Sequence, residues 1–170
     1  MGKYSVERDR ILSLYWMYGI KYSDEKPRIF QKFLKVYSSL AKELPFMSGQ
    51  LNKQVSRDEL KKIFNAMIIK PSISEEEITE VIFSIARSGI MDEITDGALK
   101  KLKGLNETYH TIIYMTYFDE VKHSTEEIIK ATRYKKTRFY EKREYAIMYM
   151  GLMIWLQISG YWEESDEDKR

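Results

Sequence analysis

The sequence predicts an all-α protein, and three observations support this prediction. The 170 residues include only three prolines and eight glycines, so few positions interrupt a helix. Runs that alternate apolar and polar residues, as half-buried strands do, are absent from the sequence. In three places a serine precedes a glutamate by three positions, which is the capping box that begins a helix: Ser56 with Glu59, Ser74 with Glu77, and Ser124 with Glu127. We therefore expect helices to begin near residues 57, 75 and 125.

Residues 1–50 predict a helical hairpin, for which we expect a role in oligomerisation or partner contact. Its first helix runs from about residue 5 to residue 20 and gathers apolar side chains on one side: Val6, Ile11, Leu14, Tyr15 and Tyr18. Pro27 suits the first turn of the second helix, where a backbone N–H has no partner within the helix. That helix keeps helical spacing among its apolar residues: Ile29, Phe30, Phe33, Leu34, Tyr37, Leu40 and Ala41. Residues 45–50 end it, and the polar stretch to residue 55 predicts a linker.

The middle segment, residues 51–104, predicts three further helices. Two of them follow the first two capping boxes. A third, short helix would be capped by Thr95 or Asp96, because both side chains can accept a hydrogen bond from a free backbone N–H, and it would end near Lys103.

The C-terminal segment, residues 105–162, opens with a helix capped by Asn106 that carries apolar residues at helical spacing: Tyr109, Ile112, Ile113 and Tyr117. An apolar run over residues 146–162 extends the last helix, and an acidic tail over residues 163–170 follows. The run is at the short edge of the length of a membrane span. A helix that is apolar on all sides must be covered, and we expect the protein's own core or a dimer interface to cover this one.

Residues 124–147 carry the strongest functional signal. A capped short helix is followed by a compact turn and then by a helix rich in basic and aromatic residues, which is the pattern of a helix-turn-helix. From Arg133 to Arg143 there are six cations and one anion, Glu141. Such a charge along one helix is typical of contact with DNA phosphates. A basic run on its own more often marks a helix face that is simply exposed to solvent. The preceding capped helix and the short turn are what favour DNA binding here.

The order of residues in this segment resembles region 4 of sigma factors, and more closely the sigma-like ArpU-type late-gene activators of Gram-positive phages. The resemblance covers about residues 105–150, and these residues match the family signature without a gap: Tyr117, Phe118, Glu127, Ile128, Tyr134, Phe139, Tyr140, Ala146 and Ile147. The sequence departs from the signature at Arg133, where glycine is usual, and a left-handed turn there costs more than at glycine. It also departs at Lys135, where serine is frequent, and at Arg138 and Phe139, where threonine and valine are usual.

The resemblance implies a cytoplasmic transcription regulator, derived from a phage or a mobile element, that binds double-stranded DNA. It also implies that the N-terminal half mediates either oligomerisation or contact with RNA polymerase. We expect phosphates to be held by Arg133, Lys135, Lys142 and Arg143, base edges to be reached by Lys136, Thr137 and Arg138, and Tyr140 to stack or to bond to phosphate. We also expect a homodimer or a higher oligomer, because a single recognition helix rarely gives enough affinity against competing sites. We expect some of the following apolar residues to lie in its interface: Tyr15, Trp16, Met17, Met150, Met153, Ile154 and Trp155.

The composition excludes several classes of function. The chain has no cysteine, which excludes a disulfide framework and a cysteine-ligated zinc finger and fits a reducing cytoplasm. No glycine-rich phosphate loop, nucleophile elbow or catalytic carboxylate pair stands out, so we expect neither an enzyme nor a cofactor. Glu107 with His110, and Glu120 with His123, resemble the ligand pairs of di-iron bundles. Thirteen residues are too few to bring both pairs to one level on separate helices, so we expect no metal site.

Two alternatives use the same features. The first is a helical protein-interaction or membrane-peripheral module whose helix over residues 135–162 is basic at one end and apolar at the other. The second is a small nucleic-acid packaging subunit, which also combines a helix-turn-helix with an oligomerising helix. We expect no membrane partner for the DNA-binding protein that we favour.

Overall fold

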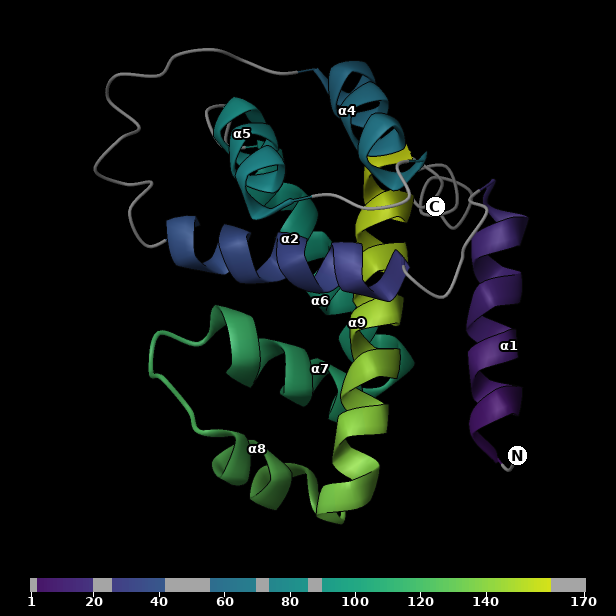
Figure 1. Cartoon of the computed structure of the whole chain (residues 1–170), viewed down its shortest axis with the longest axis vertical. Helices are drawn as coiled ribbons and strands as arrows, with labels where there is room; N and C mark the ends of the chain where they lie inside the picture. The colour runs from purple at the N-terminus through teal and green to yellow at the C-terminus, as the bar shows by residue number, and fades with distance from the viewer. Residues whose placement is uncertain (1–2, 20–25, 42–55, 70–73, 86–89, 160–170) are drawn as a thin grey trace, which may run out of the picture.

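The computed structural model describes residues 3–19, 26–41, 56–69, 74–85 and 90–159, and every regular element within these ranges is helical. In chain order the elements are α1 (Lys3–Met17), α2 (Lys26–Ala41), α4 (Arg57–Ile69), α5 (Glu75–Ile85), α6 (Ile90–Leu105), α7 (Glu107–Ile113), the π-helical segment η3 (Tyr114–Phe118), α8 (Thr125–Thr132) and α9 (Lys136–Ser159) (Figure 1). The predicted all-α class is confirmed. The predicted linker and the acidic tail lie outside the described residues.

The longest helix, α9, organises the molecule. It has 24 residues, and α1, α2, α4, α6 and α7 all pack against it (Figure 1). Its first turns lie beside α8 at one end of the molecule, and its last turns lie beside α4 at the other end (Figure 1). The buried side chains form one hydrophobic core with members from all the α-helices. The three predicted helical segments of the chain therefore share a core.

The apolar half of α9 is buried in this core. Every residue from Tyr145 to Leu156 is buried, as expected for a helix that is apolar on all sides. The chain's own helices cover four of the residues that were candidates for a dimer interface: Met150, Met153, Ile154 and Trp155. Tyr15 is likewise fully buried, whereas Trp16 is 58% exposed and Met17 is 71% exposed.

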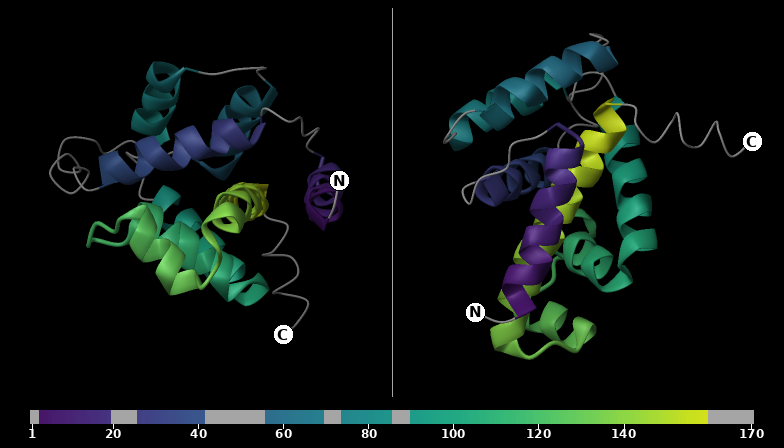
Figure 2. Two further views of the ribbon diagram at one scale, coloured as in Figure 1. Left: turned by 60° about the horizontal axis from the view of Figure 1, so that its bottom comes forward. Right: turned by 90° about the vertical axis from the view of Figure 1, so that its right-hand side faces the viewer.

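Helix α1 lies alongside α9 (Figure 2) and is fixed to it by polar contacts as well as by apolar packing. The Tyr15 hydroxyl donates a hydrogen bond to the backbone carbonyl of Met148. In the opposite sense, the indole Nε1 of Trp155 donates to the carbonyl of Tyr18 at 3.2 Å. The predicted apolar side of α1 is only partly correct, because Val6 is exposed.

The predicted helix starts are mostly confirmed. The Ser56 hydroxyl accepts a hydrogen bond from the Glu59 N–H at 3.2 Å, and α4 begins one residue after that serine. At Ser74 the box is reciprocal, because the Glu77 N–H donates to the serine hydroxyl and the Glu77 carboxylate accepts from the Ser74 N–H at 3.3 Å. Pro27 lies in the first turn of α2, as expected.

The start of α6 differs from the prediction. The helix begins at Ile90, so Thr95 and Asp96 lie inside it and cap nothing. Thr95 is 3% exposed, and its hydroxyl lies 3.4 Å from the Tyr37 hydroxyl of α2, which also donates to Asp92 at 2.7 Å. Thr95 therefore contacts α2 and does not cap a helix, although the local sequence had suggested a cap.

Candidate nucleic-acid interface

Helices α8 and α9 form a compact pair joined by a turn over residues 133–135 (Figure 1). Ser124 caps α8, and its hydroxyl accepts from the Glu127 N–H at 3.2 Å. At the start of α9 the carbonyl of Lys135 accepts from the N–H groups of both Arg138 and Phe139, each at 2.9 Å. Both predicted boundaries of this helix pair are therefore present in the structure.

The turn is made by Arg133, which ends α8 in the left-handed conformation with φ of 61° and ψ of 15°. Among the described residues it is the sole non-glycine residue with a positive φ. A left-handed L-residue costs roughly 1–2 kcal/mol because its Cβ crowds the backbone, and glycine avoids this cost. Arg133 is therefore strained in this turn, and its side chain places a positive charge there.

Phe139 fixes the rotation of α9 about its axis. Its side chain is fully buried in the core together with Ile128 of α8 and Ile113 of α7. The predicted burial of Phe139 is confirmed. Because one side of the first turn of α9 faces this core, its other residues face outward: Lys136, Thr137, Arg138 and Tyr140 are all exposed.

The exposed cations gather around the turn between the helices. Arg133 and Lys135 lie in the turn itself, and Lys136 and Arg138 lie in the first turn of α9. The N-terminal end of a helix carries a partial positive charge from its unpaired N–H groups, which adds to the field of these side chains. The result is a positive patch at one end of the molecule.

Lys142, expected from the sequence to contact phosphate, is set apart from these exposed cations by an ion pair. Its ammonium group lies 3.0 Å from the carboxylate of Glu7 on α1, and its side chain is only 21% exposed. Glu7 also accepts a hydrogen bond from the Tyr109 hydroxyl of α7, so one carboxylate joins α1, α7 and α9. Burial is the main cause that raises the pKa of Tyr109, and the hydrogen bond to Glu7 raises it further.

Arg143 is half-buried, and its guanidinium lies over the ring of Tyr140 at 5.3 Å from the ring centroid. This stacking supports the exposed tyrosine ring and leaves the guanidinium at the edge of the positive patch. Both helices also carry exposed acidic side chains. Glu144 is exposed two turns into α9, and Glu126 is exposed in the first turn of α8.

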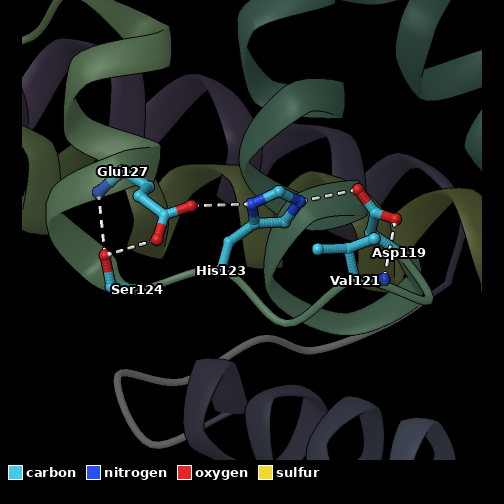
Figure 3. A network of polar contacts seen from close by, with 5 residues as sticks. All are labelled: Asp119, Val121, His123, Ser124 and Glu127. Carbon is cyan, nitrogen blue, oxygen red and sulfur yellow. Dashed lines mark hydrogen bonds and ion pairs between the residues drawn. The ribbon is translucent and has the colours of Figure 1, made fainter.

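The loop that leads into α8 is held by a histidine between two carboxylates (Figure 3). His123 Nε2 lies 2.7 Å from Asp119 Oδ2, and His123 Nδ1 lies 3.1 Å from Glu127 Oε2. The hydrogen bond with Asp119, followed by that with Glu127, raises the pKa of His123. The bonds to His123 in turn lower the pKa of both carboxyl groups. The network ties the end of η3 to the cap of α8.

The two Glu-x-x-His pairs do not meet. His110 stacks on Tyr114 with ring centroids 5.8 Å apart, and His123 is held in the loop network. Among the described residues, no group of three or more histidine, aspartate or glutamate side chains is arranged so that it could hold a metal ion.

Comparisons with known proteins gave no match: no family model matches this chain, and neither a curated protein nor a solved structure is significantly similar to it. Across the described helices, none combines the length and the apolar character needed to cross a membrane.

Proposed function

We propose that this protein is a transcription regulator that binds double-stranded DNA through the α8–α9 pair, with α9 in the major groove. The observation that carries the proposal is the joint placement of a fully buried Phe139 and four exposed cations on the turn and the first helical turn beside it. A helix-turn-helix uses this arrangement, in which a packed residue orients the recognition helix and its N-terminal residues reach the bases.

The roles of the residues follow from their positions. Arg133 and Lys135 in the turn bind phosphates and set the register of the protein on the duplex. Lys136, Thr137 and Arg138 face outward from the first turn of α9 and reach base edges, with arginine suited to bidentate contact with guanine. Tyr140 stacks under Arg143, and together they contact the backbone.

The resemblance to phage late-gene activators extends this proposal to the cellular context. We propose a cytoplasmic, phage-derived regulator with RNA polymerase as a second partner. Burial of the apolar half of α9 within the chain's own core removes the observation that favoured a membrane-peripheral module. The DNA-binding proposal does not require an exposed apolar face on α9.

A binding experiment with the full chain tests the proposal. Fluorescence anisotropy would measure affinity for fragments of the gene cluster that encodes the protein and for random DNA. Arg138→Ala should weaken binding to the preferred site by about 1–3 kcal/mol while changing affinity for random DNA much less. Lys61→Ala is the matched control, because Lys61 is an exposed cation on α4 at the opposite end of α9 (Figure 1). Equal losses in the two variants would refute the assignment.

A further inference from the structure

A pocket of about 370 Å³ lies between α2 and the segment that joins η3 to α8. Its walls come from parts of the chain about eighty residues apart: Lys35 and neighbouring polar residues of α2 on one side, and residues of η3 and of the loop after it on the other. Pockets of about 300–1,000 Å³ are the usual size for small-molecule sites. The wall formed by η3 is π-helical, with the Asp119 N–H bonded to the carbonyl of Tyr114 at 2.8 Å. Segments of this kind occur frequently at functional sites.

Two of the hydrogen-bond donors that line this pocket are positively charged. Lys35 and Lys122 both line it, and both are exposed. Lys35 lies 3.4 Å from Glu75, but both side chains are more than half exposed, so this pair holds the ammonium group only weakly. The hydroxyls on the same wall are committed elsewhere, because Ser38 and Ser39 each donate to the carbonyl of Lys35 at 3.0 Å.

Asp119, the acidic residue among those that line the pocket, is engaged in the loop network. Asp119 accepts hydrogen bonds from His123 at 2.7 Å and from the Val121 N–H at 3.1 Å (Figure 3). Its carboxylate therefore has partners within the loop, whereas Lys35 and Lys122 carry the positive charges that line the pocket. Met115 and Tyr117 of η3 add an apolar wall beside these charges.

We propose that this pocket binds a small organic anion, with its phosphate or carboxylate group between Lys35 and Lys122 and its apolar body against Met115 and Tyr117. The site is separate from the positive patch, which lies on the turn and the first turn of α9. The loop residues that line the pocket run directly into the Ser124 cap of α8, so an occupied pocket biases the position of α8. This last effect rests on the proposed function, because its consequence is a change in DNA affinity.

Phenyl phosphate is the probe, since it carries both the anion and the apolar ring. Titration of the ¹⁵N-labelled full chain, followed by ¹H–¹⁵N spectra, should shift the amide signals of Met115, Val121 and Lys122 with saturation in the millimolar range. Inorganic phosphate should shift the same signals more weakly, and benzyl alcohol, which lacks the charge, should shift them least. Unchanged signals for these residues at about 10 mM phenyl phosphate, a concentration that fills a site of millimolar Kd, would overturn the proposal.

Charge variants test the same site. Lys35→Gln and Lys122→Gln should each weaken phenyl phosphate binding about fivefold, the size of one ionic contact in water. Lys100→Gln is the control, because Lys100 is an exposed lysine on α6 that does not line the pocket. Equal affinity in all three variants would place the probe elsewhere and refute the site.

Coupling to α8 is measured separately by DNA anisotropy with and without saturating phenyl phosphate, at constant ionic strength. A change in affinity in the parent that is lost in Lys122→Gln supports the coupling. Amide shifts at the pocket together with unchanged DNA affinity would reject the coupling while the site stands. Amide shifts in a protein that binds no DNA would reject the proposed function and leave the site intact.

Discussion

The ammonium group of Lys142 lies 3.0 Å from the carboxylate of Glu7, so an ion pair joins α9 to α1. About three quarters of each side chain is shielded from water. Loss of one partner from such a pair leaves a poorly solvated charge behind, which is more costly than the loss of an exposed pair. The pair therefore stabilises the packing of α1 on α9.

Lys142→Ala should lower the free energy of unfolding by about 1–2 kcal/mol, because it leaves Glu7 without its counter-charge. It should leave the salt dependence of DNA binding nearly unchanged. Lys135→Ala should do the reverse: it should keep the stability and reduce the slope of log K against log salt by about one, because one phosphate contact releases about one counterion. Urea denaturation and anisotropy at several salt concentrations measure the two effects. A reduced slope in Lys142→Ala would return that lysine to the DNA-binding surface.

Phe139→Ala should cost about 3–5 kcal/mol of stability, because the side chain is fully buried and the substitution leaves a cavity. Phe139→Leu keeps most of the apolar volume and should cost much less. Urea denaturation of both variants gives the comparison. An alanine variant as stable as the parent but weaker on DNA would place Phe139 at the interface, contrary to the structure.

Arg133→Gly should raise the free energy of unfolding by about 0.5–1 kcal/mol, because glycine adopts the left-handed conformation without strain. Arg133→Ala keeps the strain and should show no such gain. Both variants lose the same cation, so both should bind DNA more weakly by a similar factor. This pair of variants separates the backbone cost from the charge, and equal stabilities would mean that the turn is not strained at this residue.

The two histidines should titrate on opposite sides of 6.5, their ordinary pKa. Burial lowers the pKa of His110, whereas the hydrogen bond to Asp119 raises the pKa of His123. The stabilisation from His123 is therefore fully present below its unfolded pKa and is lost as the pH rises through its folded pKa. The stabilisation from Asp119 and Glu127, whose pKa values are lowered, is lost as the pH falls through their folded values.

NMR titration of the imidazole signals checks this pattern, with His110→Gln used for assignment. His123→Ala should destabilise the protein more at pH 6 than at pH 9, because the network needs a charged imidazole. Coincident titration of the two histidines would contradict the network.

The features that the sequence predicted correctly depend on neighbouring residues. A capping box needs only Ser124 and Glu127 three positions apart, and the burial of Phe139 follows from helical spacing after a defined start. Tertiary contacts overrode local preference at Thr95, which resembles a cap but is buried against Tyr37 of α2. The prediction of a helix cap at Thr95 was wrong because the partner of this residue, Tyr37, lies 58 positions earlier in the chain.

At the candidate site the same distinction holds. Four cations near the turn could be placed from the pattern of a helix-turn-helix, but no local pattern connects Lys142 to Glu7, 135 positions earlier. The anion pocket depends on the approach of α2 to the loop after η3, and no signal in either segment predicts the other. The sequence therefore predicted the local geometry of the α8–α9 pair but not the contacts that α1 makes with α9 or that α2 makes with the loop after η3.

The last prediction concerns assembly. A helix-turn-helix protein commonly places two recognition helices about 34 Å apart through a two-fold dimer. The buried side chains of α9 are not available for this purpose, so we expect the interface to include the exposed Trp16 and Met17 of α1. Sedimentation at micromolar concentration should give about twice the monomer mass of 20.3 kDa for the parent. Trp16→Ser combined with Met17→Ser should sediment as a monomer, and Val6→Ser, a change at another exposed apolar residue of α1, should leave the dimer intact. A monomeric parent would instead favour recruitment to DNA through RNA polymerase.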